Sequence, residues 1–249
     1  MRQNTKLFFH DLGNILNDKK TLLLLLFLTL LTLIIGMSIC FTIQTDSENL
    51  LKQLKIVSNI DSIEIFSSYI IYIFSFIIFS SYPFILGILI ISYMKEFGEL
   101  ELMMLFPLNR KHFFIEKIFC IFIVSLIFSW ISVLINFLIQ IVIFNISLYF
   151  DFYILFYTTI SLPVWLLGLS YLTIFISSQS KDSKEANQKS LIFAFMLYGI
   201  IQILFIFKIN IFSSKIVFVP FLLGIVIFIV LFNFFNKKIT IEKILYNKM

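Results

Sequence analysis

The chain has 249 residues, of which 60% are hydrophobic and 13% are charged, and its mean hydropathy is +1.04. A soluble domain of this length would not carry repeated apolar runs of about 20 residues or more, so the composition excludes a soluble protein. Strands of a transmembrane barrel would alternate polar and apolar residues over about ten positions, and the sequence shows no such alternation. We therefore predict an all-α polytopic membrane protein that forms a single domain over residues 1–249.

The first 20 residues carry apolar side chains at helical spacing, with charged side chains between them. This pattern predicts an amphipathic helix that lies in the membrane interface before the first span. A frayed, solvated tail is the alternative. The apolar run that follows is too long for the central region of a signal peptide, so we expect it to be retained as a membrane span.

Six apolar runs are long enough to cross the bilayer as helices. The second and third exceed the length that a perpendicular crossing needs, so we expect them to tilt or to extend beyond the bilayer on the cytosolic side. The six predicted spans comprise residues 21–43, 63–93, 113–144, 152–177, 191–207 and 216–235.

The basic residues predict the orientation of these spans. With both termini in the cytoplasm, 15 of the 19 Lys and Arg residues lie on the cytosolic side, as the positive-inside rule requires. We expect the protein in the cell (plasma) membrane of a bacterium, with anionic membrane lipids as partners of the lysines at the span ends. The bilayer accounts for the formal net charge of +5, and no nucleic acid is expected as a partner.

A charged segment separates the second predicted span from the third. Because charge in the middle of a bilayer is costly, residues 94–112 are predicted to form a cytosolic loop. A short helix here would have an apolar face next to the carboxylates of Glu96, Glu99 and Glu101. Gly98 would allow a tight turn, and Pro107 would end the helix. A plain solvated loop is the alternative.

This segment resembles the signature of the type-2 ABC exporter permeases. The family pattern is Glu-x-Gly-Thr-x-Glu, followed by an apolar pair, a proline, a basic residue and a lysine that enters the third span. Glu99 stands where the family commonly has Thr. The six spans and the amphipathic N-terminal helix also match the layout of that family. The residues that match the pattern are Glu96, Gly98, Glu101, Pro107, Arg110 and Lys117.

The resemblance implies a non-catalytic membrane subunit of an ATP-driven exporter. In that family two permease chains pair, as a homodimer or a heterodimer, and the cytosolic loop is a coupling helix that docks on an ATP-binding cassette subunit. ATP and Mg²⁺ would bind to that subunit, so no cofactor, metal or catalytic residue is expected in this chain. The implied contact residues are Glu96, Gly98, Glu99, Glu101, Leu102, Leu105, Pro107 and Arg110.

A second polar segment, residues 178–189, precedes the fifth predicted span. Its Lys184-Glu185-Ala186 core resembles a weaker element of the same family. The resemblance implies a second contact, made by Lys184 and Glu185, with the ATP-binding subunit or the neighbouring permease. A solvated turn with the expected inner positive charge is the alternative.

Amide side chains occur inside the predicted spans. Asn136 and Gln140 are four residues apart and share one face of the third span, and Gln202 lies in the fifth. Amides in a membrane either bond to a neighbouring helix or line a pathway, and we favour helix packing over a pathway here.

Each of three spans contains a proline followed by a glycine, and such pairs predict kinks. The pairs are Pro83 with Gly87, Pro163 with Gly168, and Pro220 with Gly224.

The absence of certain sequence motifs limits the classes of function that the chain can have. The chain has no G-x-x-x-x-G-K-[ST] phosphate loop, so we do not expect it to hydrolyse ATP itself. No predicted span carries an Asp, Glu, Lys or Arg near its centre, which disfavours an ion-coupled carrier. A channel, a scramblase, an ion-coupled carrier, and a membrane immunity or anchor protein remain the alternatives to an exporter. Apolar, largely uncharged spans would suit an amphipathic peptide or another hydrophobic molecule as substrate.

Overall fold

The computed structural model describes residues 12, 13, 15, 17–45, 78–92, 94, 98, 110–145, 152–206 and 218–238. Every element in this part of the chain is a helix, as predicted, and η marks the π-helices. The elements are α2 (Lys19–Thr45), α5 (Ser81–Gly87), η2 (Ile88–Ser92), α8 (Arg110–Val142), α9 (Phe152–Phe156), η3 (Tyr157–Ser161), α10 (Leu162–Gln179), α11 (Ser183–Ile206) and α12 (Phe218–Lys238).

Three helical rods are long and apolar enough to cross a membrane: Lys19–Thr42, Phe113–Val142 and Phe152–Gln179. Two shorter apolar helices cover Ser81–Ile91 and Phe218–Asn233. For the described residues, the prediction of an all-α membrane protein is therefore confirmed. Most of the predicted interfacial helix (1–20) and of the predicted coupling loop (94–112) lies outside the described residues.

The start of α2 is fixed by a side-chain cap. The backbone amides of Lys20 and Thr21 donate to the carboxylate oxygens of Asp18 at 3.2 and 3.3 Å, and the Thr21 hydroxyl donates to the same carboxylate. The first amides of a helix have no partner within it, so a carboxylate at this position sets where the helix begins. The Thr21 hydroxyl bond, with the two amide bonds, holds the pKa of Asp18 below its ordinary value.

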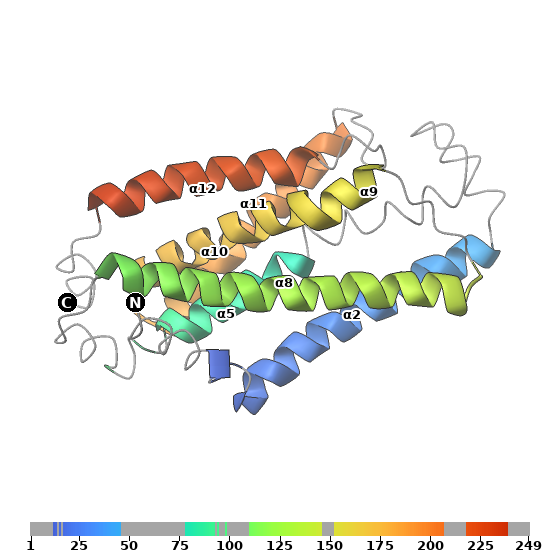
Figure 1. The fold of residues 1–249 in the computed structure, drawn as a ribbon, viewed down its shortest axis with the longest axis horizontal. Coiled ribbons are helices and arrows are strands. Elements are labelled where there is room, and N and C mark those ends of the chain that lie inside the picture. The colour runs from blue at the N-terminus through green and yellow to red at the C-terminus, as the bar shows by residue number, and fades with distance from the viewer. Residues whose placement is uncertain are drawn as a thin grey trace.

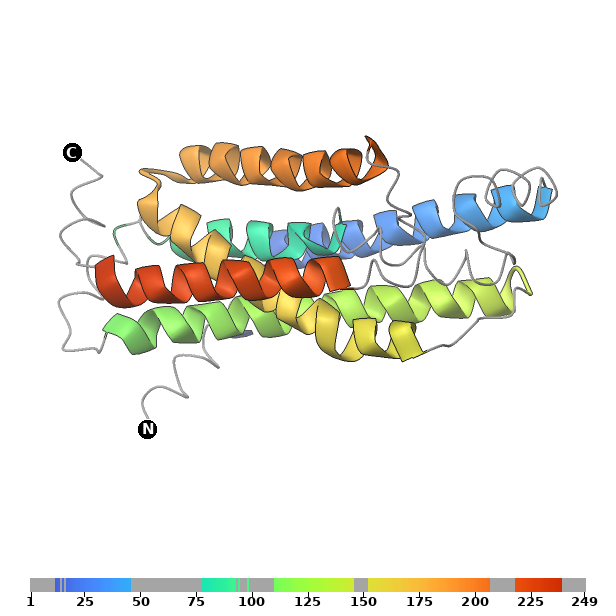
Figure 2. The same ribbon diagram turned by 90° about the horizontal axis from the view of Figure 1, so that it is seen from above.

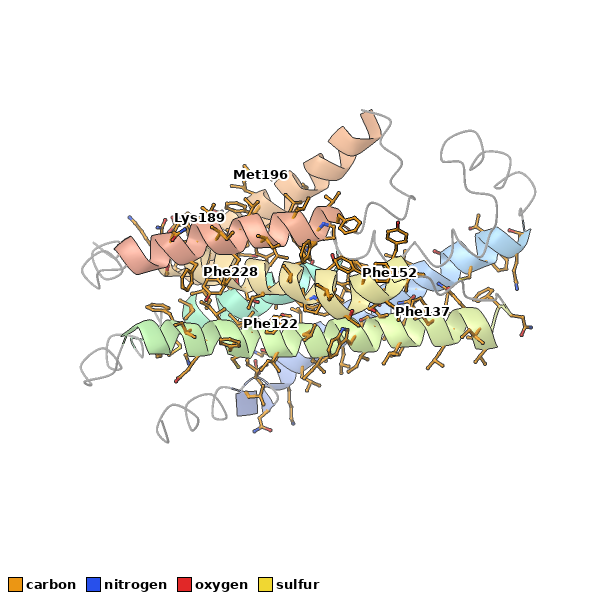
Figure 3. All side chains as sticks on the ribbon, turned by 45° about the horizontal axis from the view of Figure 1, so that its top comes forward. Phe122, Phe137, Phe152, Lys189, Met196 and Phe228 are labelled. Carbon is orange, nitrogen blue, oxygen red and sulfur yellow. The ribbon has the colours of Figure 1, made fainter. Side chains whose placement is uncertain are left out.

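The long helices pack as a bundle around α10, which contacts α12, α8, α5 and α11, while α2 packs along α8. Successive rods run in opposite directions (Figures 1 and 2). As a result, the start of α8, the end of α10, the start of α11 and the end of α12 meet at one end of the bundle. Figure 3 shows Lys189 toward this end and Phe152 toward the other.

α10 is buried on nearly all sides because its residues are apolar or small around the whole circumference. Trp165 is fully buried, and Tyr171 packs its ring edge-on against Phe228 of α12 at a centroid distance of 5.1 Å. The outer faces are apolar as well: Met196 of α11 is 59% exposed and points away from the bundle in Figure 3. Such outward apolar faces are what a helix bundle in lipid requires.

The contact between α10 and α12 depends on two glycines. A Cβ added to Gly168 would lie 2.7 Å from the carbonyl oxygen of Gly224, and a Cβ added to Gly224 would lie 2.8 Å from the carbonyl oxygen of Val164. Small residues allow helix backbones to approach this closely. These glycines, predicted to mark kinks, are sites of close helix packing.

Three prolines of the described residues lie in the first turns of helices, and each lacks the N–H that a backbone hydrogen bond would need. Pro83 is in the first turn of α5, Pro163 in that of α10 and Pro220 in that of α12. Two of these helices adjoin a π-helix, because η2 follows α5 and η3 precedes α10. The departures from regular α-helix therefore lie at α/π junctions next to these prolines.

Candidate functional site

The structure describes two of the predicted coupling residues. Gly98 has a φ of +71°, in the left-handed region that favours glycine, and lies in a turn. The predicted turn at this position is therefore confirmed. Arg110 is the first residue of α8. The other members of the predicted contact set lie outside the described residues, namely Glu96, Glu99, Glu101, Leu102, Leu105 and Pro107.

Lys117, the last residue of the matched pattern, lies two turns into α8 and is 1% exposed. Its Nζ lies 5.1 Å from the centre of the Phe113 ring, and the ring of Phe114 packs edge-on against that of Phe113 at 5.4 Å. A cation over an aromatic face is attracted by the ring, and more strongly where water is excluded. The lysine that follows the charged segment is thus built into the bundle.

The second polar segment is mostly helical, because Asp182 and Glu185 cap the start of α11. The Glu185 amide donates to Asp182 Oδ1 at 2.7 Å, and the Lys181 amide donates to Glu185 Oε2 at 2.6 Å. Lys189 forms an ion pair with Glu185 Oε1 at 2.8 Å. The Lys181 amide bond, followed by the Lys189 bond, lowers the pKa of Glu185. Glu185 is therefore engaged within its own turn, whereas Lys184 is exposed.

A line of buried polar residues runs along one face of α8. Their spacing of three or four residues keeps them on that face. Asn136 and Gln140, predicted to share a face, belong to this line and are 3% and 4% exposed. The α8 polar seam consists of Ser125, Ser129, Ser132, Asn136 and Gln140. Sequence reasoning missed the three serines, although their helical spacing from Asn136 was a visible signal.

The seam joins α8 to two neighbouring helices. Ser132 lies 3.1 Å from the Tyr82 hydroxyl of α5, and Asn136 Nδ2 donates to the Ser132 carbonyl at 2.8 Å. On the other side, a Cβ added to Gly36 of α2 would lie 2.1 Å from Asn136 Oδ1. Asn136 therefore fills the space that the missing glycine side chain leaves, although its hydrogen bond to Ser132 stays within α8 and does not join two helices.

Two more hydrogen bonds tie α10 to α5 and to Ser80, the residue before it. Trp165 Nε1 donates to Ser80 Oγ at 3.1 Å, and Ser177 Oγ donates to the Gly87 carbonyl at 3.1 Å. The hydroxyls of Ser125 and Ser129 are buried and have no hydrogen-bond partner within the described part of the chain. The polar atoms of the bundle thus serve mainly in helix contacts.

The described interior offers hydroxyls and amides but little acid–base chemistry. Among the described residues no group of three or more His, Cys, Asp or Glu side chains could hold a metal ion. Gln202 lies within α11, and its side chain is outside the described residues. The described site residues therefore suit helix packing and polar contact.

No protein-family model, curated protein or solved structure matches this chain.

Proposed function

We propose that this chain is the membrane permease subunit of an ATP-driven exporter of the type-2 ABC class. It would cross the cell membrane six times with both termini in the cytoplasm. It would pair with a second permease chain, and separate ATP-binding subunits would bind its cytosolic end. An amphipathic peptide or a similar hydrophobic molecule is the substrate class that suits its largely uncharged spans.

The observation that carries the proposal is the charged segment between the second and third spans. It keeps the family spacing from Glu96 through Pro107 to Lys117. Among the described residues of this pattern, Gly98 lies in a left-handed turn and Lys117 is buried near the start of α8, and both positions suit the proposed coupling segment.

The mechanism follows from rigid coupling. Apolar side chains of the loop would anchor it in a groove of the ATP-binding subunit, while its carboxylates would pair with basic groups at the rim and set fit and rate more than affinity. When ATP closes the two subunits, the loops would move with them and tilt the attached helices. Lys117 lies near the start of the 33-residue helix α8, which is about 50 Å long and would carry that movement through the bilayer.

The test has two parts. First, the tagged chain is purified from its native membranes after cross-linking at the 94–112 loop, and the bound proteins are identified. We expect an ATP-binding cassette subunit. If no ATPase is captured, and if no added ATPase stimulates transport by the purified chain, a channel, a scramblase or an anchor protein is favoured instead.

Second, Glu96→Ala is combined with Glu101→Ala in the reconstituted complex. We expect the double variant to insert normally but to lose the link between ATP hydrolysis and transport, since the rim contacts are gone. Asp46→Ala with Glu48→Ala removes two carboxylates from a predicted outer loop and serves as the matched control. Normal coupling in the Glu96/Glu101 double variant would count against docking at this loop.

A further inference from the structure

The rod from Phe152 to Gln179 is interrupted by a π-helix. η3 (Tyr157–Ser161) separates α9 from α10, and Figure 2 shows the rod bending in this region. In a π-helix each carbonyl pairs with the amide five residues ahead. The Leu162 amide follows this register, because it donates to the Tyr157 carbonyl.

The next carbonyl in this register has no backbone donor. Thr158 would pair with the amide of residue 163, but Pro163 has no N–H. The amide four residues ahead, that of Leu162, is already bonded to Tyr157. The sequence therefore leaves the Thr158 carbonyl without a partner from its own helix.

A side chain from another helix supplies the missing donor. Trp130 Nε1 of α8 donates to the Thr158 carbonyl at 3.1 Å. Trp130 is 42% exposed, so its ring lies at the surface of the bundle and is not held in place by burial. In a membrane an unsatisfied carbonyl is costly, so this bond holds α9 and η3 against α8.

The π-helix η2 (Ile88–Ser92) differs from η3 in this respect. At the α5–η2 junction, Ser177 Oγ donates to the Gly87 carbonyl. The residues four and five positions ahead, Ile91 and Ser92, both have an amide hydrogen. The Ser177 bond therefore adds to the available backbone donors, whereas the Trp130 bond replaces an absent one.

The segment on the outer side of η3 is linked to the start of α12. The ring of Phe156 lies 5.3 Å from that of Phe218 and 5.6 Å from that of Phe221, and Tyr153 meets Phe218 edge-on at 6.4 Å. A rotation of α9 about η3 would therefore change the contacts of Tyr153 and Phe156 with the two α12 rings. Tyr153, Phe156, Phe218 and Phe221 form what we term the outer aromatic cluster.

We propose that η3 is a hinge and that the Trp130–Thr158 hydrogen bond is its latch. With the bond made, α9 is fixed to α8. With the bond broken, α9 swings relative to α10 and shifts against the α12 rings Phe218 and Phe221, while the contacts of α10 with α8, α5 and α12 stay in place. This conformational switch is a property of the chain itself and does not depend on the identity of any transported substrate.

Hydrogen exchange of the full chain in lipid nanodiscs tests the latch. Trp130→Phe keeps an aromatic ring but removes the donor, and Pro163→Ala provides the backbone N–H that the native sequence lacks. In the native background we expect Trp130→Phe to speed exchange of residues 152–162 roughly tenfold, the loss of about one net hydrogen bond. In the Pro163→Ala background the same change should alter exchange less than twofold.

Ser177→Ala is the matched control, since it removes a cross-helix bond from a carbonyl with backbone donors and should leave exchange of 152–162 unchanged. Equal acceleration by Trp130→Phe in both backgrounds would assign the effect to ring packing and overturn the latch. No acceleration in the native background would overturn it as well. If the single Trp130→Phe variant fails to fold, the proposal still requires the variant that combines Trp130→Phe with Pro163→Ala to fold. Its amide exchange should then match that of Pro163→Ala alone.

Discussion

Asn136 shows how a buried amide can specify one helix contact. Its Nδ2 is committed to the Ser132 carbonyl, so its Oδ1 has a fixed position facing α2. Gly36 is the residue opposite, and any larger residue would overlap this oxygen. Because the amide cannot rotate away without losing its hydrogen bond, the pair fixes how α2 lies along α8.

Gly36→Ala should therefore destabilise the bundle by about 1–2 kcal/mol, the combined effect of overpacking and of a strained hydrogen bond. Asn136→Ala removes the overlapping oxygen, so adding Gly36→Ala to it should have little further effect. Unfolding of the four variants of this cycle in detergent measures the coupling. An equal effect of Gly36→Ala with and without Asn136 would show that the two residues do not meet.

At the scale of elements, composition and the lengths of the apolar runs predicted much of the structure. The apolar run 21–43 corresponds to α2, which begins two residues earlier, at Lys19, because Asp18 caps it. The run 152–177 corresponds to the rod from α9 through α10. The structure of the polar segment before the fifth predicted span was harder to predict, because a capped helix start and a solvated loop have similar composition. α11 begins at Ser183, within that segment.

The π-helices and the glycine contacts could not be predicted, because each depends on a partner far away in the chain. The Thr158 carbonyl in η3 accepts a hydrogen bond from Trp130 of another helix, and nothing near Pro163 in the sequence indicates that residue. The Gly168–Gly224 approach likewise requires two distant helices to meet at matching heights. Local patterns gave the positions of the prolines and glycines but not the residues that they meet.

Gly168 and Gly224 set the distance between α10 and α12. Gly168→Ala would place a methyl group against a backbone carbonyl, which cannot rotate away, so the two helices must separate. We expect a loss of about 1–3 kcal/mol in unfolding free energy, measured in detergent. Gly199→Ala in α11 is the matched control because nothing lies within 4 Å of its added Cβ, and it should be neutral or slightly stabilising. Equal losses at both positions would refute the close-contact interpretation.

For the whole molecule, the two ends of the bundle differ in chemistry. The end where α10 passes into α11 carries Lys181, Lys184 and Lys189, together with the ion pair to Glu185. At the opposite end, α2 and the turn after α8 are joined by a neutral bond from Gln44 Nε2 to the Phe144 carbonyl at 2.9 Å. Under the positive-inside rule we expect the lysine-rich end to face the cytosol, where the proposed ATP-binding subunit could reach it.

Cysteine labelling can test this orientation directly. The native cysteines Cys40 and Cys120 are 1% and 0% exposed, so the unmodified chain should react little with a membrane-impermeant maleimide and serves as the control. Thr45 at the end of α2 and Lys184 at the start of α11 are both exposed and lie at opposite ends of the bundle. In intact cells we expect Thr45→Cys to be labelled at once and Lys184→Cys only after the membrane is permeabilised. The reverse pattern would place the charged loop outside the cell, beyond the reach of any ATP-driven partner, and would rule out the exporter proposal.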